Sequence, residues 1–120
     1  MLHPALQGCI ILIVEDEPLI ALNIEQAFEN TGAELTVTNV MDHAILLAEH
    51  DGLSAAIVDH AIGNDTSGSL YKRLSERGIP FIIHSGHEVP ENDRRGGVVV
   101  PKPALPEELV ATIEALLRPP

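Results

Sequence analysis

Five short apolar runs, separated by longer amphipathic stretches, constrain the fold of this chain more than any other feature. The first run, Ile10–Val14, is uninterrupted and aliphatic, which is typical of a strand buried on both faces of a sheet. Strands that alternate with helices predict an α/β fold with a parallel sheet and helices on both faces. The expected strands are Ile10–Val14, Leu35–Thr38, Ala55–Val58, Phe81–Ile83 and Val98–Val100.

The stretches between these runs predict helices and two less regular segments. Pro18 suits the first turn of a helix that Gly32 ends. Gly63–Ser69 is rich in turn-forming residues and is expected to be a loop. His84–Gly97 lacks helical periodicity, so we expect mostly loop there, with at most one turn of helix. The other expected helices are Met41–His50, Leu70–Arg77 and Pro106–Leu117.

The size and charge of the chain exclude several classes of function. Its 120 residues fit one domain, and a hydrophobic share of 45% is enough for a core, which must be aliphatic because aromatic residues are few. The formal charge of −11, from 18 acidic and 7 basic residues, repels nucleic-acid phosphates and anionic lipid. We therefore expect no direct binding of nucleic acid or of membranes.

Cysteine usage and the N-terminal sequence favour a cytoplasmic protein. Cys9 is the only cysteine, so no internal disulfide can form, which is compatible with a reducing compartment. The apolar runs are far too short to span a membrane. The first eight residues lack the basic and apolar regions of a secretory signal. We expect Met1–Gln7 to be a loose leader, before a single domain with its core at about residues 9–117.

Polar side chains stand where four of the expected strands end. Glu15 and Asp16 follow the first strand, Asp59 follows the third, Ser85 the fourth and Lys102 the fifth. The carboxyl ends of parallel strands meet at one edge of the sheet, and ligands bind there. We therefore expect three carboxylates, a hydroxyl and an amine to gather at that edge.

Three carboxylates that lie close together repel one another, and so predict a bound cation. An all-oxygen site suits Mg²⁺, with Mn²⁺ as an alternative cation. One carboxylate can then attack a phosphoryl group while the others hold the metal, and a lysine neutralises the charge that develops. Asp59 stands alone at its strand end and suits the nucleophile. Glu15 and Asp16 suit the metal, and the backbone carbonyl of Ala61 is a further candidate ligand.

The chain resembles the receiver domains of two-component response regulators in four short motifs. These are Ile-Leu-Ile-Val-Glu15-Asp16-Glu17-Pro18, Ala-Ala-Ile-Val-Asp59, Ile-Ile-His-Ser85-Gly86 and Pro101-Lys102-Pro103. Each motif alone is weak evidence, but all four stand in the right order at the right strand ends. The resemblance runs from about Cys9 to Leu117, which is nearly the whole chain.

This resemblance implies a flavodoxin-like, doubly wound sheet of five parallel strands in the order 2-1-3-4-5. It implies that Asp59 accepts a phosphoryl group, which Ser85 and Lys102 contact. The metal ligands that it implies are Glu15, Asp16, Asp59 and the carbonyl of Ala61. The donor would be a histidine kinase or a histidine phosphotransfer protein, and the output would be protein–protein contact by a monomer or weak homodimer. Such a receiver is not an enzyme in its own right, although it assists its own Mg²⁺-dependent phosphoryl transfer and dephosphorylation.

The chain departs from the receiver pattern in two places. The segment between Ser85 and Lys102 is too short for a full fourth helix, which resembles a single-domain subclass in which that helix is short or absent. Val99 stands where receivers usually have Phe or Tyr, so the usual aromatic switch is missing or replaced, with His87 as the candidate replacement. Both departures concern the output more than the phosphorylation.

Other interpretations remain open at this point. The chain could be a phosphorylation-independent interaction module on the receiver fold, or a receiver excised from a larger hybrid kinase or regulator. A Mg²⁺-dependent phosphatase of small molecules is disfavoured, because such enzymes carry an Asp-x-Asp motif and Asp59-His60-Ala61 lacks the second aspartate. His60, His84 and His87 fit no zinc-ligand spacing.

Overall fold

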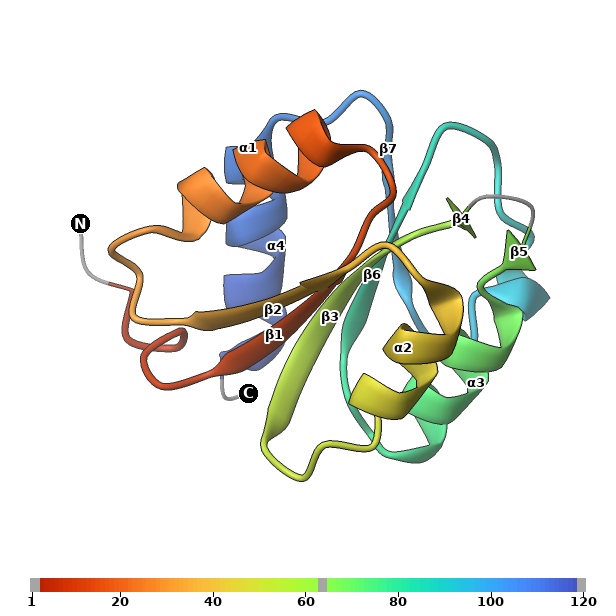
Figure 1. The fold of residues 1–120 in the computed structure, drawn as a ribbon, viewed down its shortest axis with the longest axis horizontal. Coiled ribbons are helices and arrows are strands. Elements are labelled where there is room, and N and C mark those ends of the chain that lie inside the picture. Colours follow the sequence, from red (N-terminus) through yellow and green to blue (C-terminus); the bar gives the residue numbers. More distant parts are fainter. Residues whose placement is uncertain (1–2, 63–64, 119–120) are drawn as a thin grey trace.

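Parallel strands form one sheet with helices on both faces (Figure 1). The structure is a computed structural model that describes residues 3–62 and 65–118. Within this part of the chain, the five-stranded sheet has the order β2-β1-β3-β6-β7, and all neighbouring strands run parallel. This confirms the predicted flavodoxin-like order 2-1-3-4-5. The strands are β1 (Ile10–Val14), β2 (Glu34–Thr38), β3 (Leu53–Asp59), β6 (Phe81–Ser85) and β7 (Val98–Pro101).

The helices cover the sheet in two pairs. Helices α1 (Pro18–Phe28) and α4 (Pro106–Leu117) lie together on one face, and α2 (Met41–Leu47) and α3 (Gly68–Glu76) lie on the other (Figure 1). All four helices were expected from the sequence, with ends that differ by a few residues. No helix in the described ranges is long and apolar enough to cross a membrane.

The pleat of β1 explains why its sequence is an unbroken aliphatic run. Leu12 and Val14 belong to the core beneath α2 and α3, whereas Ile11 and Ile13 belong to the core beneath α1 and α4. Successive side chains of a strand point to opposite faces, so a strand covered on both sides must be apolar at every position. The same double burial holds β1 and β3 firmly at the centre of the sheet.

The expectation that Met1–Gln7 is a loose leader is wrong for the residues that the structure describes. The Leu6 side chain is fully buried in the core beneath α1 and α4. The Gly8 amide donates to the Gly32 carbonyl at 3.0 Å, and the His3 ring contacts the Glu114 carboxylate. A single apolar residue in a turn has no periodicity, so the sequence pattern could not reveal this packing.

The predicted loop at Gly63–Ser69 is also partly wrong. Strands β4 (Ala61–Ile62) and β5 (Asp65–Thr66) pair antiparallel, and α3 begins at Gly68. Residues 63 and 64 lie outside the described part. The turn-forming residues were recognised, but a two-residue ladder is too short to show an alternating pattern.

The segment after β6 agrees with the expectation of mostly loop. Its only helical turn within the described residues is the 3₁₀ turn η1 (Glu91–Asp93). The segment is nevertheless anchored: Val89 is fully buried, and Arg94 Nε donates to the Val89 carbonyl at 2.8 Å. At its end, a Cβ on Gly97 would lie 2.3 Å from the Phe81 ring, so only glycine allows this approach.

Replacing Leu6 by alanine is expected to lower the free energy of unfolding by about 2–5 kcal/mol, because the substitution leaves a cavity in the core. The matched control is Leu19→Ala, since the Leu19 side chain is 75% exposed on α1. We expect that control to change stability by about 0.5 kcal/mol or less. Urea unfolding of both variants is the measurement, and equal losses would contradict the packing described for the N-terminal segment.

Candidate functional site

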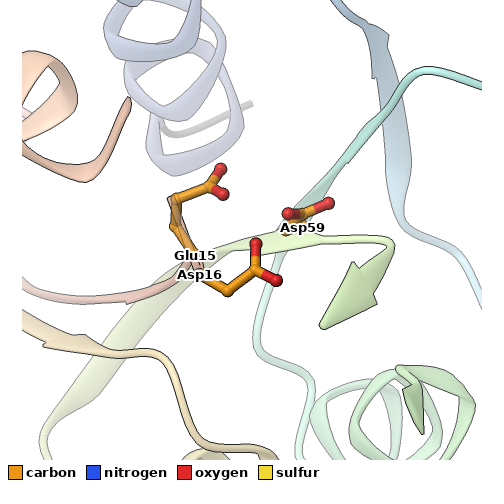
Figure 2. Close-up of side chains that lie close together, drawn as sticks. All are labelled: Glu15, Asp16 and Asp59. Atoms are coloured by element: carbon orange, nitrogen blue, oxygen red, sulfur yellow. The ribbon is translucent and has the colours of Figure 1, made fainter. Parts of the chain in front are cut away.

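The five polar side chains predicted to gather at the sheet edge do lie together. Glu15 and Asp16 directly follow β1, and Asp59 is the last residue of β3 (Figure 2). Ser85 is the last residue of β6, and Lys102 directly follows β7. The parallel register brings these ends level, since Asp59 is paired with His84 and Ser85 with Pro101. The sheet itself therefore assembles the site.

The three carboxylates form a cluster that suits a hard cation. One oxygen from each of Glu15, Asp16 and Asp59 lies within 4.8 Å of the others. Glu15 and Asp59 are buried, while Asp16 is exposed, so one side of the cluster is open to water. This donor set fits Mg²⁺, which takes oxygen ligands and keeps several waters. Ala61 begins β4 two residues after Asp59, and the role of its carbonyl stays a prediction.

Burial and crowding strongly affect Glu15. The pKa of this carboxyl is raised from 4.5 to about 7, chiefly by burial and also by a hydrogen bond with Asp59 and its negative charge, against the opposing Glu17 amide and the Lys102 charge. That amide donates to Glu15 Oε2 at 3.2 Å. A bound cation would favour the ionised form, because it neutralises the repulsion between the carboxylates.

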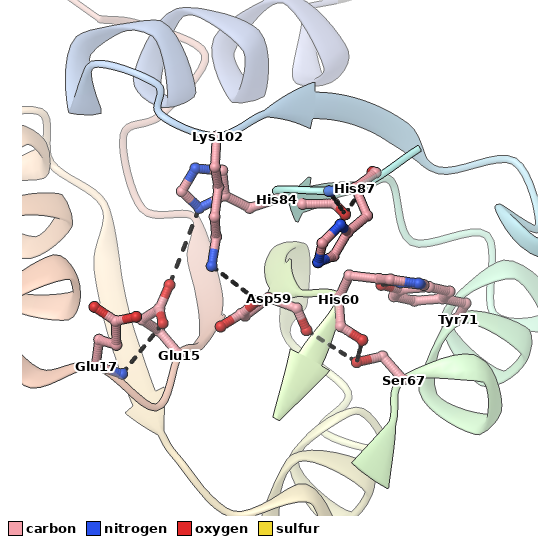
Figure 3. A network of polar contacts seen from close by, with 10 residues as sticks. Glu15, Glu17, Asp59, His60, Ser67, Tyr71, His84, His87 and Lys102 are labelled. Carbon is pink, nitrogen blue, oxygen red and sulfur yellow. Dashed lines mark hydrogen bonds and ion pairs between the residues drawn. The ribbon is translucent and has the colours of Figure 1, made fainter. Parts of the chain in front are cut away.

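Lys102 supplies the positive charge that the cluster otherwise lacks. Its Nζ donates to Asp59 Oδ1 at 3.0 Å (Figure 3). Burial alone would lower the pKa of Lys102, but the hydrogen bond and charge of Asp59, with the charges of Glu15 and Glu17, raise it above its usual value. The ammonium group is therefore charged and directed at the carboxylate that we expect to react. The Lys102–Pro103 peptide bond is cis.

The Ser85 hydroxyl is held by the turn that follows it. Its Oγ donates to the His87 carbonyl at 2.8 Å and accepts from the His87 amide at 3.1 Å. Ser85 lines a pocket of about 310 Å³ together with Asp16, Asp59 and Lys102. A group bound to Asp59 in this pocket would compete with the His87 carbonyl for the hydroxyl. Ser85 thus links the pocket directly to the segment after β6.

A second layer of contacts around Asp59 was not found by sequence reasoning. The buried Ser67 Oγ donates to the Asp59 carbonyl at 2.9 Å and to the His60 carbonyl at 3.1 Å. His60 Nδ1 and the Tyr71 hydroxyl share a hydrogen bond of 3.0 Å, and their rings stack. Tyr71 stacks in turn on Phe81. The one available signal was that Tyr71 is the only tyrosine of the chain and lies on the apolar stripe of α3.

The two predicted switch positions have different environments. His87 is exposed and lies at the rim of the Asp59 pocket, so it does not fill an interior aromatic position in this structure. Val99 is partly buried and packs against the core beneath α2 and α3. The buried Tyr71 ring stacks on His60, the residue that follows Asp59. Any role of His87 or Val99 in switching stays a prediction.

His84 is the unusual residue of the site. It lies in β6 beside Asp59, is 4% exposed, and its Nδ1 is 4.0 Å from Glu15 Oε1. Burial, followed by the charge of Lys102, lowers the pKa of His84, so the ring is neutral. Among the described residues, neither ring nitrogen has a hydrogen-bond partner. Buried polar groups are nearly always hydrogen-bonded, so this ring requires an explanation.

Comparison with known proteins finds similar sequences and similar structures among response regulators. No family model matches the chain. The chain is 30% identical over 124 residues to the two-component response regulator PprB of Pseudomonas aeruginosa, a match that covers 94% of this chain and 45% of that protein. The chain spans about half the length of the curated relatives that it matches.

Solved structures of similar fold cover the chain almost completely. The receiver domain of a Francisella response regulator has a TM-score of 0.77 and 26% identity, and the match covers 92% of this chain and 97% of that one. The receiver domain of a sensor histidine kinase from Pseudomonas aeruginosa PAO1 has a TM-score of 0.77 and 21% identity, over 92% and 98% of the two chains. That second structure has a magnesium ion coordinated in its active site cleft.

The raised pKa of Glu15 predicts how pH affects the metal-free protein. Since the folded pKa of about 7 lies above the ordinary 4.5, the folded state binds more protons between these values, and the free energy of unfolding falls as pH rises through this window. Mg²⁺ affinity is expected to rise over the same window, by up to about tenfold per pH unit, because the metal requires the ionised carboxylate. Calorimetric Mg²⁺ titrations at several pH values measure this rise.

Glu15→Gln tests this prediction. Glu17→Gln is its matched control, since Glu17 is two residues from Glu15 and exposed. Glu15→Gln is expected to weaken Mg²⁺ binding and to flatten its pH dependence below pH 7, whereas Glu17→Gln keeps the slope. An unchanged slope in Glu15→Gln would show that another group controls the metal.

Proposed function

We propose that this chain, which is a receiver domain of the two-component response-regulator family, accepts a phosphoryl group on Asp59 from a phosphohistidine donor. The observation that supports this most is the arrangement around Asp59. Its buried carboxylate receives a hydrogen bond from the Lys102 ammonium and lies next to two further carboxylates, in a pocket open to solvent.

In the proposed reaction, a carboxylate oxygen of Asp59 attacks the phosphorus. The new oxygen–phosphorus bond forms as the nitrogen–phosphorus bond of the donor histidine breaks, and its electron pair returns to the imidazole. Lys102 then exchanges its contact with Asp59 Oδ1 for one with a phosphoryl oxygen, where its charge stabilises the developing negative charge. The Ser85 hydroxyl donates a hydrogen bond to another phosphoryl oxygen instead of the His87 carbonyl, and thereby releases that carbonyl.

The acidic cluster is proposed to hold Mg²⁺, or Mn²⁺ in its place. Its ligands would be Glu15, Asp16, Asp59 and the Ala61 carbonyl. When bound, this ion would offset the repulsion between the carboxylates and the incoming phosphoryl group. A related receiver with magnesium in its active site cleft supports the choice of metal. The acidic, partly open donor set of the present chain supports it independently.

The proposed partners follow from the phosphoryl transfer. A histidine kinase or a histidine phosphotransfer protein supplies the phosphoryl group, and the output is protein–protein contact without direct nucleic-acid binding. The chain assists its own phosphorylation and dephosphorylation but turns over no separate substrate. Release of Ser85 from the His87 carbonyl would loosen the segment after β6, which makes that segment the proposed output surface.

Incubation with acetyl phosphate and Mg²⁺ is expected to add one phosphoryl group to the intact protein. The adduct should be absent in Asp59→Asn and in the presence of EDTA, because the nucleophile or the metal is then missing. Asp51→Asn is the matched control, since the Asp51 side chain is fully exposed and precedes the start of β3, at the opposite end of that strand from Asp59; it should keep the adduct. Intact-protein mass spectrometry is the measurement.

Rapid hydrolysis could hide an adduct, so the same samples are also titrated with beryllofluoride and Mg²⁺ and followed by NMR. Amide shifts around Asp59 in the wild type, absent in Asp59→Asn, would support the proposal. Neither an adduct nor such shifts in the wild type would leave the phosphorylation-independent module as the better account.

A further inference from the structure

Asp59 lies one residue beyond the last pair of the ladder between β1 and β3. That ladder ends where Val14 is paired with Val58. On the other side of β3, strand β6 continues, and Asp59 is paired with His84. The ladder with β6 therefore extends to Asp59 while the ladder with β1 does not, at a point where three carboxylates lie together and repel one another.

Two side chains from the start of α3 contact the chain directly after β3. The Ser67 Oγ donates to the Asp59 carbonyl at 2.9 Å and to the His60 carbonyl at 3.1 Å (Figure 3). One helical turn later, the Tyr71 hydroxyl shares a hydrogen bond of 3.0 Å with His60 Nδ1, and the two rings stack. The Tyr71 amide donates to the Ser67 carbonyl at 3.0 Å, so both residues belong to the same turn. We call Ser67 and Tyr71 the α3 clamp.

The α3 clamp is shielded from water. Ser67 and Tyr71 both have an exposed fraction of 0%. Water therefore has no access to replace the Ser67 hydroxyl, and its removal would leave backbone carbonyl groups without this donor. The Tyr71 ring also stacks on Phe81, and both rings belong to the core beneath α2 and α3. The core of the protein thus holds the clamp in position.

The short hairpin after β3 brings the predicted backbone ligand of the metal next to the same clamp. Strand β4 begins at Ala61, which is paired with Thr66 at the end of β5, and Ser67 follows directly. The turn from Asp59 to Ala61 is therefore joined to the start of α3 both through this pairing and through the Ser67 hydrogen bonds.

We propose that Ser67 and Tyr71 are positioning residues of the Mg²⁺ site, which hold Asp59 and the Ala61 carbonyl in place against the repulsion between the carboxylates. Ligands that are fixed before the ion arrives lose less freedom when it binds, so the α3 clamp raises the affinity for Mg²⁺. Contacts that orient metal ligands from outside commonly contribute about 10–100-fold to metal affinity. The inference rests on the proposed Mg²⁺ site and adds the residues that set its affinity.

The test is a calorimetric Mg²⁺ titration of the full chain at pH 8, above the pKa of Glu15 and at a temperature where every variant is folded. Ser67→Ala is expected to bind Mg²⁺ about tenfold more weakly than the wild type. Tyr71→Phe keeps the buried ring and loses only the hydroxyl. It is expected to weaken binding about fivefold, which is the effect of one typical hydrogen bond.

Thr31→Ala is the matched control. The Thr31 hydroxyl is also buried and donates to a backbone carbonyl, that of Phe28, at 2.6 Å. Thr31 follows the end of α1, whereas Asp16 precedes the start of that helix. Urea unfolding should show that Thr31→Ala and Ser67→Ala both lose stability, but Thr31→Ala should keep the wild-type affinity for Mg²⁺.

Carbonyl ¹³C resonances give a second measurement on the metal-free chain. Those of Asp59 and His60 should move in Ser67→Ala and stay in place in Thr31→Ala. Wild-type Mg²⁺ affinity in either clamp variant would overturn the role of that residue, and an equal loss of affinity in Thr31→Ala would overturn the inference as a whole. A wild type that binds no Mg²⁺ would instead overturn the proposed metal site, and this inference with it.

Discussion

The repulsion between the buried carboxylates of Glu15 and Asp59 is the constraint on which the functional edge of this molecule depends. Two acids in a partly dry environment cannot both ionise without compensation. Burial first, and then the hydrogen bond and charge of Asp59, raise the pKa of Glu15 to about 7. Lys102 compensates from one side, by its hydrogen bond to Asp59. The open side next to Asp16 leaves room for a cation to supply the rest.

The scaffold keeps these charges in place despite their repulsion. Double burial fixes β1 and β3, and the parallel register brings the ends of β6 and β7 level with them. The Ser67 hydroxyl, next to the start of α3, donates a hydrogen bond to the Asp59 carbonyl. The rings of His60, Tyr71 and Phe81 stack, and Phe81 packs closely against Gly97 at the end of the segment after β6. The surround of Asp59 therefore contacts that segment through the Ser85 hydroxyl and through the aromatic stack.

The sequence was sufficient for the sheet and for the polar side chains that meet at its edge, because both follow from strong patterns. Unbroken aliphatic runs such as Ile10–Val14 identify buried parallel strands, and polar residues directly after them must meet at one edge. The buried position of Leu6 and the β4–β5 hairpin escaped prediction, because neither is periodic. The buried ring of His84, whose nitrogens have no hydrogen-bond partner among the described residues, also escaped prediction, because its environment is made by residues that are distant in sequence.

The most direct test of the account is a crystal structure of the chain with Mg²⁺ and beryllofluoride, a stable mimic of a phosphoryl group on aspartate. The account predicts beryllium on an Asp59 oxygen, the metal among Glu15, Asp16 and Asp59, and Lys102 and Ser85 turned toward the fluorides, with the Ser85 hydrogen bond to the His87 carbonyl broken. A metal bound elsewhere, or an Asp59 that stays paired with Lys102 and carries no adduct at saturating beryllofluoride, would contradict it.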